Sequence, residues 1–459
     1  MNIQILKEVF SMVQSITPEN IKQFKADFKA VPQSSVIKNT VMNNGFLASS
    51  QNTTSKALMD PVFSIDLDTG AVSNQKQSGR CWMFAALNTM RHSLQAQFKI
   101  KDFELSQNYT NFWDKFEKSN YFYENVLKTA DQPIGDRKVD FLMTTPQQDG
   151  GQWDMLCALI EKYGIVPKSV MPETYNSEKS SELNSVLNLK LRKDAVTLRQ
   201  LVADGVSEAD IQAKKDTMLT EVYRMLVYAL GEPPVEFDFE YRDDDHNYHI
   251  EKGLTPQTFY QKYVGWDLEN YVSLINSPTA DKPYNHLYSV EMLGNVVGGR
   301  EVRHLNLDID DFKQLAIKQL QAGESVWFGS DVGQSSDRKL GIMDTEIYQK
   351  AALLNMDLSI SKGERLDYGE SLMTHAMVIT GVDIVDGQPT KWKVENSWGD
   401  KVGTKGYFVM SDSWFDEFVY QIVINKRFLT AEMQRIEKEE YDHPTVLAPW
   451  DPMGALASR

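Results

Sequence analysis

Residues 75–88 read QKQSGRCWMFAALN, a polar loop that runs into an apolar segment of helical character. Ser78 is a residue type that caps helices, so we expect a helix to begin just after it and Cys81 to lie in the first turn. Peptide dipoles at a helix start, together with a neighbouring imidazolium, lower a cysteine pKa from about 8.5 to ~3.5–7.5. Cys81 is therefore the candidate nucleophile, and its N–H and the side chain of Gln75 are candidate donors to an oxyanion.

A β-hairpin is predicted near the end of the chain. Residues 373–384 are largely apolar and β-branched, Asp386-Gly387 is a strong turn signal, and residues 391–396 alternate in polarity. If the turn has two residues, Val385 opposes Gln388, which fixes the pairing of all the residues further from the turn.

The register of this hairpin brings two polar residues together. Met377 then faces Asn396, and His375, two positions along the same strand, points to the face on which Asn396 lies. A single cysteine at a helix start is more often a small buried hydrophobe, and a single histidine on an apolar strand is more often a core residue. The shared face favours catalysis, because a general base needs a group that orients its ring.

Three blocks, in chain order, resemble the papain superfamily. They are Gln75 placed six positions before Cys81-Trp82, then Thr374-His375-Ala376, then Asn396-Ser397-Trp398-Gly399. The resemblance implies that Cys81 is the nucleophile, His375 the general base and later acid, Asn396 the group that orients the imidazole, and Gln75 the oxyanion donor. It further implies that Trp398 shields the hydrogen bond between His375 and Asn396 from water.

More narrowly, the chain resembles the bleomycin hydrolase and bacterial aminopeptidase C family over nearly its whole length. Residues 77–84, the late segment 446–457 and the 294 positions between Cys81 and His375 carry this resemblance. It implies a cytosolic cysteine aminopeptidase that releases N-terminal amino acids from peptides through an acyl-enzyme. It also implies a homohexamer with active sites that face an inner channel. We expect no cofactor and no metal.

The same resemblance gives the C-terminal tail, residues 441–459, a role in substrate binding. The tail is expected to reach the active-site cleft, where a terminal carboxylate near Ala457 binds the α-amino group of the substrate. Ser458-Arg459 follow that position, and we expect aminopeptidase activity to fall if both are retained. Gly151, in the run Asp149-Gly150-Gly151, resembles a glycine that hydrogen-bonds the substrate backbone, although a plain turn before a helix explains it about as well.

The fold class expected from these features is α+β. A helical lobe bearing Cys81 packs against a β-rich lobe bearing His375 and Asn396, with the cleft between them. We expect a single papain-like catalytic domain over residues 1–459. It carries an N-terminal extension at 1–60 that is loop-rich after Val31, and a large helical insertion at about 165–290.

Composition narrows the function classes. The formal net charge of −16 over 459 residues opposes binding to a phosphate backbone, so we do not expect a nucleic-acid partner.

Two cysteines are too few for a disulfide framework, and neither a secretion signal nor a membrane span is predicted. Both observations favour the cytoplasm. Cys157 is expected in the core, and residues 243–249, which contain two histidines among aspartates, are better explained as a solvated acidic loop than as a zinc site.

Other interpretations of the same residues stay open. A papain-like endopeptidase would use the same catalytic groups but would cleave N-blocked substrates. A thiol acyltransferase could also use them, and a non-catalytic scaffold could keep the fold without the chemistry. Rapid, selective labelling of Cys81 over Cys157 by iodoacetamide would separate an enzyme from a scaffold.

Overall fold

The computed structural model describes residues 14–457 of the chain. The chain divides into two compact units, which are described separately: the N-terminal unit, residues 1–54 with 346–359, and the main unit, residues 55–345 with 360–459. Residues 1–13 of the expected extension, and the pair Ser458-Arg459, lie outside the described residues.

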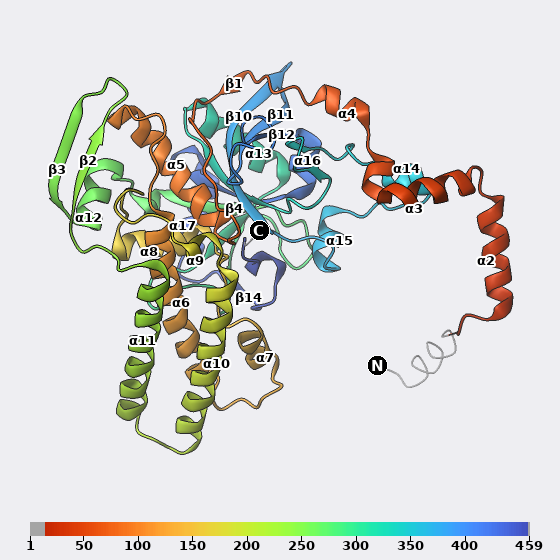
Figure 1. Cartoon of the computed structure of the whole chain (residues 1–459). Coiled ribbons are helices and arrows are strands. Elements are labelled where there is room, and N and C mark those ends of the chain that lie inside the picture. The colour runs from red at the N-terminus through yellow and green to blue at the C-terminus, as the bar shows by residue number, and fades with distance from the viewer. Residues whose placement is uncertain (1–13, 458–459) are drawn as a thin grey trace. The chain divides into compact units, whose positions relative to one another are not determined.

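The N-terminal unit is helical (Figure 1). Helix α2 (Pro18–Ala30) begins as its sequence indicates, with Thr17 as the cap and Pro18 in the first position. Helix α3 (Ser34–Ser50) packs against α14 (Lys350–Leu354). The prediction of a loop-rich segment after Val31 is therefore wrong.

Polar side chains explain why helix α3 was missed. Asn and Ser often compete with helical backbone bonds, so their abundance at 34–50 indicated a loop. Here Asn43 Nδ2 donates to the carbonyl of Asn39 at 2.8 Å, and Ser49 Oγ donates to that of Gly45 at 2.7 Å. These bonds reach back four residues and leave the helix intact, although Gly45, at φ 75°, kinks it.

The β-rich part of the main unit is one mixed sheet, which holds twelve of the strands found within residues 14–457 (Figure 1). Its spatial order is β14-β5-β6-β4-β13-β7-β10-β11-β12-β9-β8, and β1 also pairs with β10. In chain order the strands are β1 Ile65–Asp66, β4 Tyr271–Ile275, β5 His286–Val290, β6 Arg303–Asn306, β7 Val326–Ser330, β8 Ser336–Asp337, β9 Ile342–Met343, β10 His375–Val385, β11 Gln388–Glu395, β12 Tyr407–Ser411, β13 Val419–Asn425 and β14 Thr445–Leu447.

Strands β10 and β11 form the predicted hairpin. Asp386 and Gly387, at φ 51° and 81°, make the two-residue turn, and Val385 opposes Gln388. One extra residue in each strand shifts the register and then restores it, so that Val378 opposes Glu395 as simple counting requires. The predicted register is thus confirmed at both ends of the hairpin.

Helices make up the other half of the main unit. Helix α5 (Cys81–Phe98) packs against β10, while α10 (Ser181–Ala203) and α11 (Glu208–Leu230) pair with each other beside α6 (Gln107–Lys128) (Figure 1). The remaining helical segments of the main unit are α7 Arg137–Thr144, α8 Trp153–Tyr163, α9 Tyr175–Glu178, α12 Pro256–Phe259, η1 Tyr260–Val264, η2 Leu268–Asn270, α13 Ile309–Gln321, α15 Lys362–Asp367, α16 Asp412–Phe418, η3 Lys426–Phe428, α17 Ala431–Glu440 and η4 Pro452–Gly454. A short helix, α4 (Thr53–Leu58), spans the boundary between the two units.

The stretch at 165–290 is less helical than expected. Its long helices end at Leu230, after which β2 (Phe237–Arg242) and β3 (Tyr248–Leu254) form a separate two-stranded sheet. Strands β4 and β5, in the second half of the stretch, belong to the large sheet. The helical periodicity at 179–230 was real, but it did not extend to the aromatic segment that follows.

Strand β10 lies between two apolar cores. The helical core contains Cys81, Met83 and Leu87 from α5 and also Val378. The core of the sheet contains Met377 and Ile379, the neighbours of Val378 that point to the other face. The predicted α+β fold, with a helical and a β-rich lobe, is confirmed.

No helix within residues 14–457 is long and apolar enough to span a bilayer.

Candidate active site

Helix α5 begins at Cys81, so the thiol lies in the first turn as predicted. The predicted cap is wrong, because Arg80 is the N-cap residue and forms no side-chain cap. Ser78 instead donates to the carbonyl of Gln75 at 2.7 Å and accepts from Arg80 Nε at 3.0 Å. The guanidinium of Arg80 also pairs with Glu173, so the loop before Cys81 is held on both sides.

His375 and Asn396 lie together at the open end of the β10–β11 hairpin. The Nε2 atom of His375 is 2.9 Å from Oδ1 of Asn396, and both side chains are buried. Because an amide oxygen only accepts hydrogen bonds, Nε2 carries a proton, and Nδ1 is the nitrogen that gains or loses one. The backbone N–H of Ala376, the next residue after His375, donates to Cys81 Sγ at 3.5 Å. The structure thus brings the three predicted residues to one place.

The indole of Trp398 lies against the imidazole of His375. The two ring centroids are 4.7 Å apart, with 27° between the planes. The guanidinium carbon of Arg338 lies 4.2 Å from the centroid of the Trp398 ring. Trp398 therefore limits the movement of the imidazole. Its indole ring also lies beside the cationic guanidinium of Arg338.

Gln75 is fixed by the segment that follows Asn396. Its N–H donates to the carbonyl of Ser397 at 2.8 Å, and its Oε1 accepts from Ser397 Oγ at 2.6 Å. Its Nε2 donates to the carbonyl of Ser78 at 2.6 Å. Asn74 and Trp398 form an antiparallel bridge beside these contacts. The loop before the nucleophile is therefore tied directly to the segment that carries the orienting amide.

The C-terminal tail reaches the residues predicted to bind substrate. Ala457 forms an antiparallel bridge with Gly151 and is buried. Gln152 Nε2 donates to the carbonyl of Ala455 at 2.6 Å. A Cβ atom on Gly151 would lie 2.5 Å from the Trp82 ring, so a glycine is needed for this close approach.

The comparisons with known proteins agree with this geometry. A model of the Peptidase C1-like family matches residues 15–454. The chain belongs to this family. It is 61% identical to Aminopeptidase C of Lactobacillus delbrueckii subsp. lactis over 446 residues, which cover 97% of this chain and 99% of that one. It is 51% identical to Aminopeptidase C of Listeria monocytogenes, with 97% and 100% covered. The crystal structure of pepw from Lactobacillus rhamnosis HN001 superposes with a TM-score of 0.96 at 75% identity, covering 97% of this chain and 100% of that one.

This Peptidase C1-like protein has a buried polar cluster that the sequence interpretation missed. Asp149 accepts hydrogen bonds from the N–H of Gly79 at 2.8 Å, from Lys115 Nζ at 2.7 Å, from Asn184 Nδ2 at 2.8 Å and from Ser180 Oγ. Burial raises the pKa of this carboxyl, but the charge of Lys115 and these hydrogen bonds outweigh burial and lower it. Asp149 thus joins α6, α10 and the loop before the nucleophile.

Two other predicted features of the Peptidase C1-like chain lie away from these residues. Cys157 is buried in α8, and burial raises the pKa of its thiol well above the usual value. In the acidic loop, Asp243 accepts from the N–H of Asn247 at 2.8 Å and contacts Nε2 of His249 at 2.9 Å. The Asp243 carboxylate therefore closes the turn between β2 and β3.

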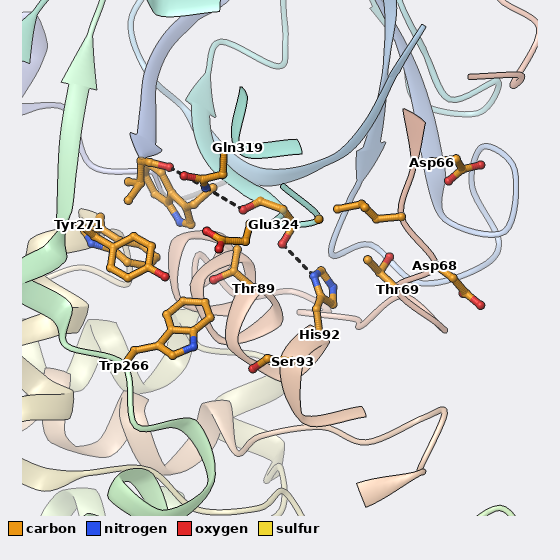
Figure 2. A pocket seen from close by; sticks show the side chains of 16 residues that line it. Asp66, Asp68, Thr69, Thr89, His92, Ser93, Trp266, Tyr271, Gln319 and Glu324 are labelled. Carbon is orange, nitrogen blue, oxygen red and sulfur yellow. Dashed lines mark hydrogen bonds between the residues drawn. The ribbon is translucent and has the colours of Figure 1, made fainter. Parts of the chain in front are cut away.

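A pocket of about 310 Å³ lies beside the middle of α5 (Figure 2). His92 of α5 lines this pocket together with Trp266 and Tyr271. His92 contacts Ser325 Oγ at 2.9 Å and the Glu395 carboxylate at 3.0 Å, and burial lowers the pKa of its imidazole. His92 is eleven residues, or about 16 Å, along the helix from Cys81, so this pocket is separate from the thiol.

Proposed function

We propose that this protein is a cysteine aminopeptidase of the bleomycin hydrolase type, in which Cys81 is the nucleophile, His375 the general base and acid, and Asn396 the group that orients the imidazole. Similarity over nearly the whole chain to aminopeptidases C supports the activity. The buried contact between His375 and Asn396, beside the thiol at the start of α5, supports the assignment of roles.

Acylation begins with attack of the Cys81 thiolate on the carbonyl carbon of the N-terminal residue of the peptide. A carbon–sulfur bond forms and the carbonyl oxygen becomes an oxyanion. The N–H of Cys81, in the first turn of α5, and the side-chain amide of Gln75 are the donors that we assign to that oxyanion. The carbon–nitrogen bond then breaks, and the His375 imidazolium gives its Nδ1 proton to the leaving amine.

Deacylation reverses these roles. Neutral His375 takes a proton from water, whose oxygen attacks the thioester, and the carbon–sulfur bond breaks to restore the thiolate and release the amino acid. Asn396 keeps the proton on Nε2, so that Nδ1 is always the nitrogen that exchanges protons with the reacting groups. Trp398 keeps the ring in that orientation by stacking on it.

The bridge between Ala457 and Gly151 is the observation that favours an aminopeptidase over an endopeptidase. We assign to Gly151 the binding of the substrate backbone on the acyl side. The tail already pairs with Gly151 at this position. A longer chain on that side would have to displace the tail. The tail therefore leaves room for one residue before the scissile bond, and a carboxylate near Ala457 would pair with the free α-ammonium.

We also propose that the enzyme is a cytoplasmic homohexamer. Helices α2 and α3 expose large apolar side chains, among them Phe24, Phe28 and Phe46 at 54%, 48% and 53% of their surface, which supports burial against further copies of the chain. Cys81 and Cys157 are not joined in a disulfide, which supports a reducing compartment. Sedimentation velocity and cell fractionation test these points, and a stable monomer would contradict the assembly.

A panel of fluorogenic amides tests the activity. We expect hydrolysis of aminoacyl amides and none of the same amides after N-acetylation, because acetylation removes the ammonium and extends the acyl side. Faster cleavage of N-acetylated substrates would instead support the endopeptidase alternative. Chains ending at Ala457 and at Arg459 should be compared, and equal activity of the two, with Arg459 shown to be retained by mass spectrometry, would contradict the role of the carboxylate.

A further inference from the structure

The leaving side of the site has a pocket of its own, about 540 Å³ in volume. Its lining includes Gln75, Ser78 and Gly79 from the loop before the nucleophile, and Trp398. If His375 protonates the leaving amine, as the proposed function requires, the leaving peptide passes beside the imidazole and the Trp398 ring stacked on it. Because the tail pairs with Gly151, we assign the leaving peptide to this pocket.

The charge of this pocket is opposite to that of the protein. Lys76 and Arg338 line it, and none of the lining residues within 14–457 is acidic, although the chain has a net charge of −16. Both side chains are exposed, and Arg338 is held over Trp398. The acid next to it, Asp337, accepts through Oδ1 from the N–H groups of Lys339 and Leu340, each at 3.0 Å.

The pocket beside the tail has the reverse character. It has a volume of about 630 Å³, and among the described residues its lining contains four acids, Asp281, Glu291, Asp367 and Asp451, and one cation, Lys282. Lys282 is paired with Asp281 and Asp451. The two pockets therefore differ in the sign of their charged lining residues, and the pocket beside Trp398 is the one that suits an anionic group.

We propose that Lys76 and Arg338 form a carboxylate-binding subsite for the leaving part of the substrate. The inference rests on the proposed function and adds a substrate class to it: peptides that present a carboxylate within one or two residues after the scissile bond. That carboxylate comes either from an acidic side chain or from the C-terminus of a dipeptide. Arg338 is the main specificity residue, because stacking on Trp398 orients its guanidinium.

Three leucyl dipeptides, compared in two pairs, test the subsite. Leu-Glu-NH2 and Leu-Gln-NH2 differ only in a side-chain carboxylate, while Leu-Gln and Leu-Gln-NH2 differ only in the C-terminal one. All three give the same leucyl acyl-enzyme, so a difference in kcat/KM reports the leaving side. We expect at least one carboxylate to raise kcat/KM about fivefold, as for a partly exposed charge pair. The effect should fade at about 1 M salt, where the Debye length is about 3 Å.

Variants assign the effect to residues. Arg338→Gln should bring the kcat/KM ratio of the responding pair close to one, and Lys76→Gln should lower it. Lys339→Gln, which removes the neighbouring exposed charge outside the pocket lining, should keep the wild-type ratio. If loss of Arg338 merely disturbs Trp398, kcat/KM falls by the same factor for both substrates of a pair, and their ratio keeps the wild-type value.

The outcomes separate the inference from the proposed function. Hydrolysis of all three peptides with equal kcat/KM, or a carboxylate preference that survives Arg338→Gln, overturns the subsite and leaves the aminopeptidase intact. If none of the three is hydrolysed, the proposed function fails and the subsite fails with it. The pair that responds shows whether the side-chain or the C-terminal carboxylate is bound.

Discussion

Replacement of Asp149 by asparagine removes the negative charge from the buried cluster in front of α5. In the wild type this carboxylate accepts from Gly79 N–H, from Lys115, and from Ser180 and Asn184 at the start of α10, and Lys115 is fully buried. The asparagine amide offers one acceptor oxygen and turns an NH2 group towards donors. Lys115 then keeps a buried charge without its anionic partner, which typically costs about 3 to 5 kcal/mol of unfolding free energy.

The same substitution should reduce catalysis beyond its effect on stability. Gly79 lies two positions before Cys81, so loss of its acceptor loosens the loop that carries the nucleophile and Gln75. A displacement of about 1 Å at such a site can lower a rate about 100-fold. We expect kcat for leucyl amides to fall at least about tenfold, measured at a temperature where circular dichroism shows the variant to be folded.

Urea unfolding of Asp149→Asn provides the assay, with Asp204→Asn as the control. Asp204 is an exposed aspartate at the end of α10, where the same change should alter stability by about 0.5 kcal/mol or less. The double variant Lys115→Met, Asp149→Asn should lose less than the sum of the single variants, because it removes both charges. Wild-type unfolding and wild-type kcat in Asp149→Asn would refute the reasoning.

Three further predictions follow from single residues. Asn396→Ala removes the acceptor of the imidazole N–H, and kcat should fall about 100-fold with little change in KM; an unchanged kcat would exclude an orienting role. Gly151→Ala places a Cβ atom against Trp82, so we expect about 1 to 3 kcal/mol less stability in urea unfolding and a lower kcat/KM for leucyl amides; wild-type values would show that the ring yields. Burial lowers the pKa of the His304 imidazole to about 4, whereas it is about 6.5 in the unfolded chain. The free energy of unfolding should therefore rise with pH between these values. About 3 kcal/mol of it should be lost as the pH falls from 6.5 to 4. His304→Gln should flatten the dependence of the melting temperature on pH in this window, and an unchanged dependence would contradict the assignment.

Turn chemistry and strand periodicity were enough to predict how His375 and Asn396 meet. Asp386-Gly387 fixes the turn, and side chains alternate with a period of two, so the face of each residue follows by counting. The bulges in the two strands were not visible in the sequence, but each adds one residue and their shifts cancel. The count from the turn therefore reached the correct face.

Features that depend on distant partners could not be predicted. Ser78 is a good capping residue by type, but in the fold its hydroxyl bonds Gln75 and Arg80, and the helix begins later. The role of Asp149 depends on Lys115 and on α10, which lie more than 30 positions away along the chain. In the sequence, the signal for this role of Asp149 was its position directly before Gly150-Gly151, because a charged residue beside a predicted substrate-binding glycine needs a buried partner.

The central claim is that Cys81 forms the covalent intermediate, and trapping that intermediate tests it most directly. The enzyme is mixed with a leucyl ester, quenched in acid within milliseconds, digested and analysed by mass spectrometry. The account predicts one leucyl group, as a thioester, on the peptide that contains Cys81 and none on the peptide that contains Cys157. Hydrolysis of the ester without an adduct on Cys81 under conditions that slow deacylation, or an adduct on Cys157 instead, would contradict it.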